Sequence, residues 1–291
     1  RLKGMSYVSP VASAQIKSSL LFAALYADGL TTISEPRLSR DHTERMFAYF
    51  GIPFERDGCT VRIEGRPSVR WSGKPVLVPG DLSAAAFFLV GASIVPGSDV
   101  TVRNVGMNPT RTGLIDILRE MGAHIEVLNP REEAGEPVAD LRVLSRRLHG
   151  VRIGPDQIPQ TSDEFPILCV AAAVAEGETV VTGAEELRVK ESDRIATMAK
   201  ELRAMGARIE ERPDGMVIQG LGHNGANGAL AGAIAHVLLT EGLWNREFVG
   251  DFKDGKNLFV AGKAVDEGAF AEKETYGLVK WWNLELKDRT P

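Results

Sequence analysis

Residues 164–175, EFPILCVAAAVA, lead through Glu176 into residues 177–181, GETVV. A continuous apolar run of small and branched residues favours a buried helix, a glycine is typical of a helix end, and the β-branched residues favour a strand. The same succession occurs twice earlier in the chain: 13–27 leads to 29–33, and 83–95 leads to 97–102. This repetition indicates a structural repeat.

A second helix pattern follows in each of the three copies. Residues 41–50, 112–121 and 195–205 each end at a glycine that precedes a short strand pattern. Asp57-Gly58 and Pro213-Asp214-Gly215 then predict hairpin turns in two of the copies. The glycines that end the first helices are 68 and 80 residues apart. The sequence therefore predicts an α/β fold of repeated βαβαββ units of about that size.

Two breaks in this rhythm divide the chain. A Pro/Ser/Gly-rich stretch at 66–75 separates the first copy from the other two, and it is typical of a linker. After Gly220 a Gly/Asn-rich stretch and an Ala-rich helix pattern follow, without the expected Thr/Val strand. We therefore expect domains at 1–74 and 75–220, and a different piece at 221–291.

The composition limits the classes of function. The 291 residues are 44% hydrophobic and 25% charged, which is enough for one large or two ordinary domains. The formal net charge of −5 argues against nucleic acid as the main partner, although local cations can still bind small anions. No run approaches the roughly 18 apolar residues of a membrane helix, which argues against a membrane protein. Because the chain begins Arg1-Leu2-Lys3, we expect it to come from the middle of a longer protein.

The two cysteines show no metal-ligand spacing. Cys169 lies within the apolar run, where a buried inert thiol is expected, and Cys59 lies in a predicted hairpin. A disulfide framework is not indicated, which fits a cytoplasmic protein.

The stretch 188–194, RVKESDR, concentrates charge at a predicted helix start. Lys190 and Arg194 are four residues apart, so they can face one anionic ligand at a helix N-terminus. The charge pattern fits a salt-bridged surface helix start at least as well, with Ser192 or Asp193 as the cap. The pattern alone leaves both interpretations open.

Three further stretches carry the same ambiguity. In 159–166, PQTSDEFP, Asp163 could be a helix cap or a general base at the mouth of a site. In 9–19, SPVASAQIKSS, free backbone N–H groups at a helix start suit a phosphate, but also a capped core helix. In 39–44, SRDHTE, Asp41 and Glu44 could form a capping box, which leaves Arg40 as a possible anion contact.

Taken together, these stretches resemble the 5-enolpyruvylshikimate-3-phosphate (EPSP) synthase family. The resemblance runs in order over residues 1–220 and rests on SPVASAQIKS, EPRLSRDHTE, PGDLSAAAFF, SDEFP and, most specifically, RVKESDR. It implies two domains of βαβαββ units arranged as an inside-out barrel. It also implies the reaction, in which the 5-hydroxyl of shikimate 3-phosphate attacks C2 of phosphoenolpyruvate, a tetrahedral adduct forms and phosphate leaves. A monomer is implied, with neither metal nor organic cofactor.

The resemblance assigns roles to residues by position. Asp163 would act as the base near the 5-hydroxyl, and Glu191 would handle the proton on the methylene carbon of phosphoenolpyruvate. Arg194 would hold the phosphoenolpyruvate anion together with Gln15 and Lys190. The contacts to shikimate 3-phosphate would come from Ser13, Ala14, Gln15, Arg40, Asp163 and Lys190.

The sequence also departs from the family pattern. The first N-terminal units and the last unit have no counterpart here, so we expect one unit of the first domain, two of the second, and impaired turnover. Residues 221–291 instead resemble a fragment of molybdopterin-dependent oxidoreductases. Two alternatives therefore stand beside the transferase: a molybdopterin-binding oxidoreductase fragment and a non-catalytic α/β scaffold. A sister enzyme that uses a UDP-sugar acceptor would usually have a reactive cysteine in a loop. Cys59 and Cys169 lie in hairpin and core contexts instead, so this enzyme fits the sequence less well.

Overall fold

The computed structural model describes residues 1–66, 73–190, 192–204, 206–222, 252–253 and 256–257. The chain divides into two compact units, Arg1–Gly225 and Ala226–Pro291. In the second unit, the described residues form two short antiparallel strands, β12 (Phe252–Lys253) and β13 (Lys256–Asn257). The remaining elements belong to the first unit.

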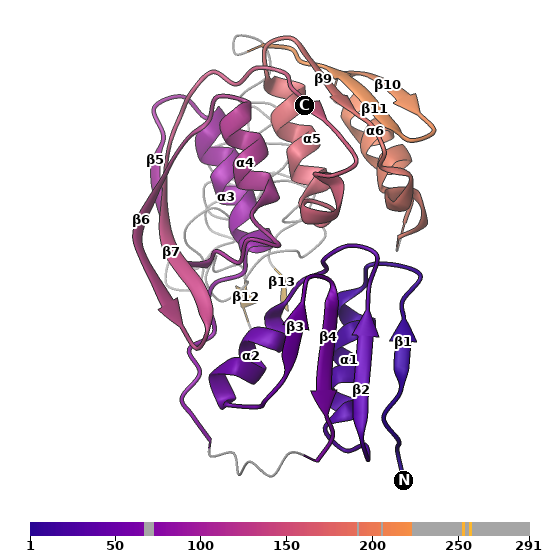
Figure 1. The fold of residues 1–291 in the computed structure, drawn as a ribbon. Helices are drawn as coiled ribbons and strands as arrows, with labels where there is room; N and C mark the ends of the chain where they lie inside the picture. The colour runs from indigo at the N-terminus through magenta and orange to yellow at the C-terminus, as the bar shows by residue number, and fades with distance from the viewer. Residues whose placement is uncertain (67–72, 191, 205, 223–251, 254–255, 258–291) are drawn as a thin grey trace. The chain divides into compact units, whose positions relative to one another are not determined.

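The first copy of the repeat is a four-stranded sheet with two helices (Figure 1). The sheet order is β1-β2-β4-β3, in which β1 and β2 are parallel and the other pairs are antiparallel. Its elements are β1 (Ser6–Val8), α1 (Ala14–Ala24), β2 (Leu30–Ser34), α2 (His42–Phe50), β3 (Glu55–Asp57) and β4 (Thr60–Glu64). The order of elements along the chain is the predicted βαβαββ.

A later copy repeats this topology strand for strand. Its sheet order is β8-β9-β11-β10, again with a parallel first pair and antiparallel pairs after it. Its elements are β8 (Arg152–Ile153), α5 (Phe165–Val174), β9 (Glu178–Val181), α6 (Arg194–Ala204), β10 (Arg208–Arg212) and β11 (Gly215–Gln219). Two copies with the same pairing confirm the repeat inferred from the sequence.

The middle copy has longer strands and a shorter first element. Gly80 forms a parallel bridge with Val105 at the place that β1 and β8 take in the other copies. The sheet order is β5-β7-β6, with register shifts near Val102 and Leu128. The elements are α3 (Leu82–Ile94), β5 (Asp99–Gly106), α4 (Gly113–Glu120), β6 (His124–Glu133) and β7 (Glu136–Leu144).

The first helix of the middle and last copies is buried on nearly every side. Helices α3 and α5 pack against each other (Figure 1), and Leu89, Val90, Ala171 and Ala173 have almost no exposed surface. Small side chains allow this close packing, which explains why these stretches are apolar without helical periodicity. In the first copy, the core forms around Phe47 and Ile33. Among the described residues, every helix is too short or too polar to cross a membrane.

Candidate active site

Asp163 lies between a short 3-10 helix, η1 (Ile158–Gln160), and α5. The interpretation of Asp163 as a helix cap is wrong, because Glu164 takes the N-cap position and makes no side-chain capping bond. The Asp163 carboxylate instead forms an ion pair with Arg40, 123 residues away in the sequence. Its other oxygen lies 3.6 Å from Arg194 Nη1, which donates to the Ser162 carbonyl at 2.7 Å.

These cations decide the charge state of Asp163. Partial burial would raise its pKa, but the hydrogen bond and charge of Arg40 outweigh burial, and the charges of Arg194 and Arg111 add to that effect. The pKa is therefore lowered, and the side chain is an acceptor-only carboxylate at neutral pH. The structure thus brings three of the predicted site residues, Arg40, Asp163 and Arg194, to one place.

Beside Asp163 lies a polar cluster that was not predicted. Glu164 is buried and accepts a hydrogen bond from the Ser83 hydroxyl. Arg111 Nη2 donates to Ser83 Oγ at 2.6 Å and lies 3.1 Å from Asp81 Oδ1. Burial raises the pKa of Glu164, against the lowering effects of Ser83 and Arg111. The polar residues at the start of α3 were a sequence signal, but nothing in their spacing pointed to Glu164.

The stretch 188–194 divides into structural and site-facing residues. Arg188 Nη1 forms ion pairs with Asp193 at 2.8 Å and Glu211 at 3.1 Å, and its Nε donates to the Pro213 carbonyl at 2.7 Å. Asp193 also caps α6, because its Oδ1 accepts from the Ala196 N–H at 2.9 Å. Arg188 and Asp193 therefore match the structural interpretation of this stretch, which is a salt-bridged helix start.

The other charged residues of this stretch have different surroundings. Lys190 follows a 3-10 helix, η2 (Glu185–Val189), and its Nζ lies 2.8 Å from Glu186 Oε1. Arg194 begins α6 and reaches Asp163. The structure thus brings Arg194 to the Arg40–Asp163 pair and holds Lys190 on Glu186. Glu191, the predicted proton-handling residue, lies outside the described residues.

Ser13, Ala14 and Gln15 stand at the start of α1, as expected. Ser13 is the N-cap, and its Oγ accepts from the Ile16 N–H at 3.3 Å. Gln15 is exposed. The capped-helix interpretation is therefore confirmed for Ser13, and it leaves the other N–H groups of the first turn for an anion.

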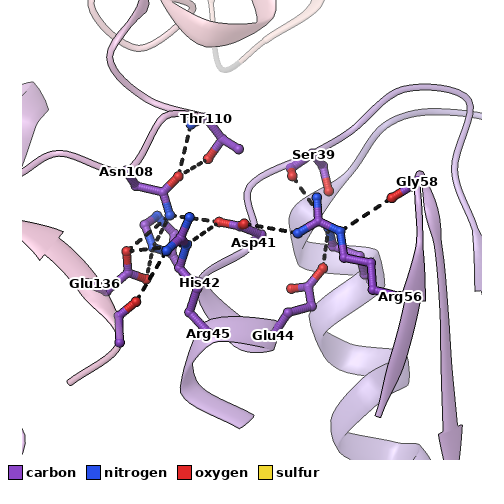
Figure 2. Close-up of polar contacts among 12 residues, drawn as sticks. Ser39, Asp41, His42, Glu44, Arg45, Arg56, Gly58, Asn108, Thr110 and Glu136 are labelled. Atoms are coloured by element: carbon purple, nitrogen blue, oxygen red, sulfur yellow. Dashed lines mark hydrogen bonds and ion pairs between the residues drawn. The ribbon is translucent and has the colours of Figure 1, made fainter. Parts of the chain in front are cut away.

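Arg40 belongs to the loop between β2 and α2. The predicted capping box at 41–44 is wrong: Asp41 makes no capping bond, and Glu44 lies 2.8 Å from Lys17 Nζ instead. The Asp41 carboxylate accepts hydrogen bonds from Asn108, Arg45 and Arg56 (Figure 2). The contact with Asn108 links the first copy of the repeat to the middle one.

The cysteines and the histidines within the described ranges take no part in the contacts of Asp163 given above. Cys169 is buried, as predicted, and burial raises the pKa of its thiol. Cys59 is partly exposed in the turn between β3 and β4, and both cysteines are free. His42 Nδ1 lies 2.7 Å from Glu136 Oε1, a contact that does not include Asp163. Within the described ranges, no group of three His, Cys, Asp or Glu side chains is arranged to hold a metal ion.

Comparison with known proteins gives one consistent family. The family model described as EPSP synthase (3-phosphoshikimate 1-carboxyvinyltransferase) matches residues 1–234. The chain is 51% identical over 274 residues to 3-phosphoshikimate 1-carboxyvinyltransferase from Geobacter sulfurreducens, covering 94% of this chain and 59% of that protein. It is 60% identical over 220 residues to the Methylococcus capsulatus protein of the same name, covering 76% of this chain and 50% of the relative.

A solved structure agrees with these sequences. The EPSP synthase from Acinetobacter baumannii is similar with a TM-score of 0.72 and 50% identity, over 76% of this chain and 50% of that chain. The present chain therefore spans about half the length of the relatives that it matches. The Geobacter alignment covers 274 residues, or 94% of this chain, so it must extend past Gly220. These matches give no support to a molybdopterin oxidoreductase at 221–291, most of which lies outside the described residues.

Proposed function

Since this chain belongs to the EPSP synthase (3-phosphoshikimate 1-carboxyvinyltransferase) family, we propose that it takes part in enolpyruvyl transfer from phosphoenolpyruvate to the 5-hydroxyl of shikimate 3-phosphate. The observation that carries the proposal is the convergence of Arg40, Arg194 and Asp163 from three distant stretches of sequence. Two fixed cations suit phosphate and carboxylate anions, and an ionised carboxylate between them suits a proton acceptor.

Shikimate 3-phosphate is proposed to lie along the start of α1 and the Arg40 loop. Arg40 would bind its phosphate, and the first turn of α1, with Ser13, Ala14 and Gln15, would contribute polar groups. A phosphate competes with Asp163 for the Arg40 guanidinium. Substrate binding would thereby remove the main influence that lowers the pKa of Asp163, and the carboxylate would become a better base for the 5-hydroxyl proton.

Phosphoenolpyruvate is proposed to lie against Arg194, Lys190 and Gln15. As the hydroxyl oxygen bonds to C2, the methylene carbon takes up a proton, and the later loss of phosphate and of a proton restores the double bond. Glu191, which lies outside the described residues, is the proposed carrier of that proton. Lys190 would have to leave Glu186, an exposed i,i+4 partner, at little cost in free energy.

The wider assignments follow the same family. We propose domains at 1–74 and 75–220, a cytoplasmic monomer, and no role for nucleic acid, membrane or cofactor; the family match past Gly220 argues against the expected unrelated segment at 221–291. A non-catalytic scaffold is the alternative that a binding experiment separates. The turnover of this chain is proposed to be impaired relative to enzymes of the usual range, about 1–10³ per second.

Isothermal titration of the chain with shikimate 3-phosphate tests the proposal. We expect saturable binding, and we expect Arg40→Ala to weaken it roughly 10- to 100-fold, because a charge-assisted contact contributes about 1.5–3 kcal/mol. Arg37→Ala is the matched control, since Arg37 is an exposed arginine of the same loop. An affinity that Arg40→Ala leaves unchanged would contradict the proposed site.

Phosphate release from the two substrates tests the chemistry separately. We expect slow release above the background of the substrates alone, and its loss in Asp163→Asn with shikimate 3-phosphate still bound. Release that is the same in Asp163→Asn and the parent chain would remove Asp163 as the base. No binding of either substrate would favour the scaffold.

A further inference from the structure

Arg40 lies between two residues that buried polar groups hold in place. On one side, the Ser39 N–H donates to Glu35 Oε1 at 3.0 Å, and the Ser39 carbonyl lies 3.5 Å from Lys17 Nζ. Lys17 and Glu35 are 2% and 7% exposed and form an ion pair at 2.9 Å. The first copy of the repeat therefore fixes the backbone just before Arg40.

On the other side, Asp41 is held by a residue from the middle copy. Asp41 is 5% exposed, and its Oδ1 accepts from Asn108 Nδ2 at 2.8 Å. Asn108 is 2% exposed and follows β5. It belongs to the stretch 75–220, which also contains Asp163. Figure 2 shows Asn108 and Asp41 facing each other, with Arg45 and Arg56 on the same carboxylate.

The orientation of the Asn108 amide is set by its other partners. Its Oδ1 accepts from the Thr110 N–H at 2.9 Å and from Thr110 Oγ1 at 2.7 Å. Its Nδ2 also donates to Glu136 Oε2 at 3.1 Å. A flipped amide would set its oxygen against the carboxylates of both Asp41 and Glu136, so the NH₂ group must face them.

We propose that Asn108 is a positioning residue, which acts through Asp41 to fix Arg40 opposite Asp163. Asp41 shares a peptide bond with Arg40, so a shift of Asp41 moves the base of the arginine side chain. A shift of this kind weakens the contact between Arg40 and Asp163, because hydrogen bonds lose strength steeply with distance and angle. The inference rests on the proposed function only for what Arg40 would bind.

The contact itself can be tested without a ligand, through the carboxyl ¹³C resonance of Asp163 in the full chain. Arg40→Ala is expected to raise the measured pKa of Asp163, and Asn108→Ala to raise it in the same direction by a smaller amount. In the Arg40→Ala background, Asn108→Ala should have no further effect, because it acts through the arginine. Equal shifts with and without Arg40, or no shift in Asn108→Ala, would overturn the proposal.

Two further variants guard against a purely structural effect. Asn129→Gly is the matched control: its amide donates to Asp140 at 3.0 Å, and glycine suits its φ of 49°. It should leave the pKa of Asp163 unchanged. If Asn108→Ala fails to fold, Thr110→Val removes only the hydroxyl that orients the amide, and a smaller rise in the pKa of Asp163 is expected. An unchanged value in folded Thr110→Val would then count against the proposal.

Shikimate 3-phosphate binding extends the test to the proposed function. Asn108→Ala should weaken binding roughly 3- to 10-fold in the parent chain and not at all in Arg40→Ala. If the chain does not bind this ligand while the pKa of Asp163 behaves as expected, the proposed function fails and the positioning role stands. If the chain binds the ligand normally and Asn108→Ala leaves the pKa of Asp163 unchanged, the positioning role fails and the proposed function stands.

Discussion

At the scale of single residues, the two thiols differ in their surroundings. Cys169 is buried in α5, where burial raises its pKa, whereas Cys59 is partly exposed in a hairpin turn. Because the thiolate is the reactive form, we expect one fast-reacting thiol per native chain and two after denaturation. Titration with a coloured disulfide reagent measures this, and Cys59→Ser should remove the fast reaction. Two fast thiols in the native chain would contradict the buried position of Cys169.

Asp41 is expected to make stability depend on acid. Burial would raise its pKa, but hydrogen bonds from Asn108, Arg45 and Arg56 and the charge of Arg45 lower it overall. A lowered folded pKa adds stability above the unfolded value of about 3.9, and this is lost as the pH falls through the folded pKa. Asp41→Asn should therefore lose roughly 1.5–3 kcal/mol at pH 7 and much less at pH 2.

Urea unfolding of both proteins at several pH values measures this difference. Asp140→Asn is the control, because Asp140 also accepts a hydrogen bond from an asparagine but its side chain is more exposed than that of Asp41. An equal loss for Asp41→Asn at pH 7 and pH 2 would mean that its charge contributes nothing to stability.

Single residues also set the limit of sequence-based prediction. The stretch 188–194 contains Arg188 and Arg194 in similar local surroundings, yet the first pairs with Asp193 and the second reaches Asp163. Asp193 lies within the stretch itself, whereas Asp163 lies 31 residues before Arg194, so the local pattern could not assign Arg194 its partner. Asn108 gave no signal, because its role comes from Asp41, 67 residues earlier.

At the scale of elements, two glycines mark the same close approach in two copies of the repeat. A Cβ on Gly65 would stand 2.2 Å from the Ala27 carbonyl oxygen, and one on Gly220 would stand 2.0 Å from that of Ala175. Each glycine follows the last strand of its copy and lies against the end of the first helix. The obstacle is backbone, which cannot rotate away as a side chain can.

We expect Gly220→Ala to destabilise the protein by about 3 kcal/mol or more, at the upper end for overpacked sites. Gly91→Ala is the matched control: its Cβ would meet nothing within 4 Å inside helix α3, and it should stabilise by roughly 0.5–1 kcal/mol. Thermal unfolding of both variants tests the contrast. Equal and small effects would mean that the helix and strand can separate without cost.

Elements were the most predictable level of this fold. The helices that end at Gly51, Gly122 and Gly206 were predicted to within a residue or two, because a glycine in the left-handed region ends each of them. The repeat predicted the order of elements, but it did not by itself specify that β1 pairs in parallel with β2 and β8 with β9. The lengths of β6 and β7 in the middle copy were not predictable. The two strands are joined by a turn of only two residues, Ala134 and Gly135, which the sequence pattern did not identify as a turn.

At the scale of the whole molecule, net charge and local charge oppose each other. The chain carries a formal charge of −5, whereas Arg40 and Arg194 converge on one site. Attraction of an anionic ligand to such a site is screened by salt, since the Debye length falls from about 10 Å at 0.1 M to about 3 Å at 1 M. We expect shikimate 3-phosphate to bind several-fold more weakly at 1 M salt.

Titrations at both salt concentrations measure this slope. Arg40→Ala should give a shallower dependence on salt than the parent chain, and Arg37→Ala should keep most of it. A slope that is the same in Arg40→Ala would place the electrostatic attraction elsewhere on the molecule.

The family and the repeat were predictable from the sequence at this scale, whereas the contacts that join distant stretches were not.

The junction around Asp41 and Asn108 also has a consequence for the order of folding. Pairing within one copy joins residues close in sequence, as with Ser6 and Thr32, whereas Arg40 meets Asp163 across 123 positions. Closing a longer loop costs more entropy and gains nothing until its contacts form. We therefore expect the strand pairing within each copy to form early and the contacts among Arg40, Asp163 and Arg194 to form late.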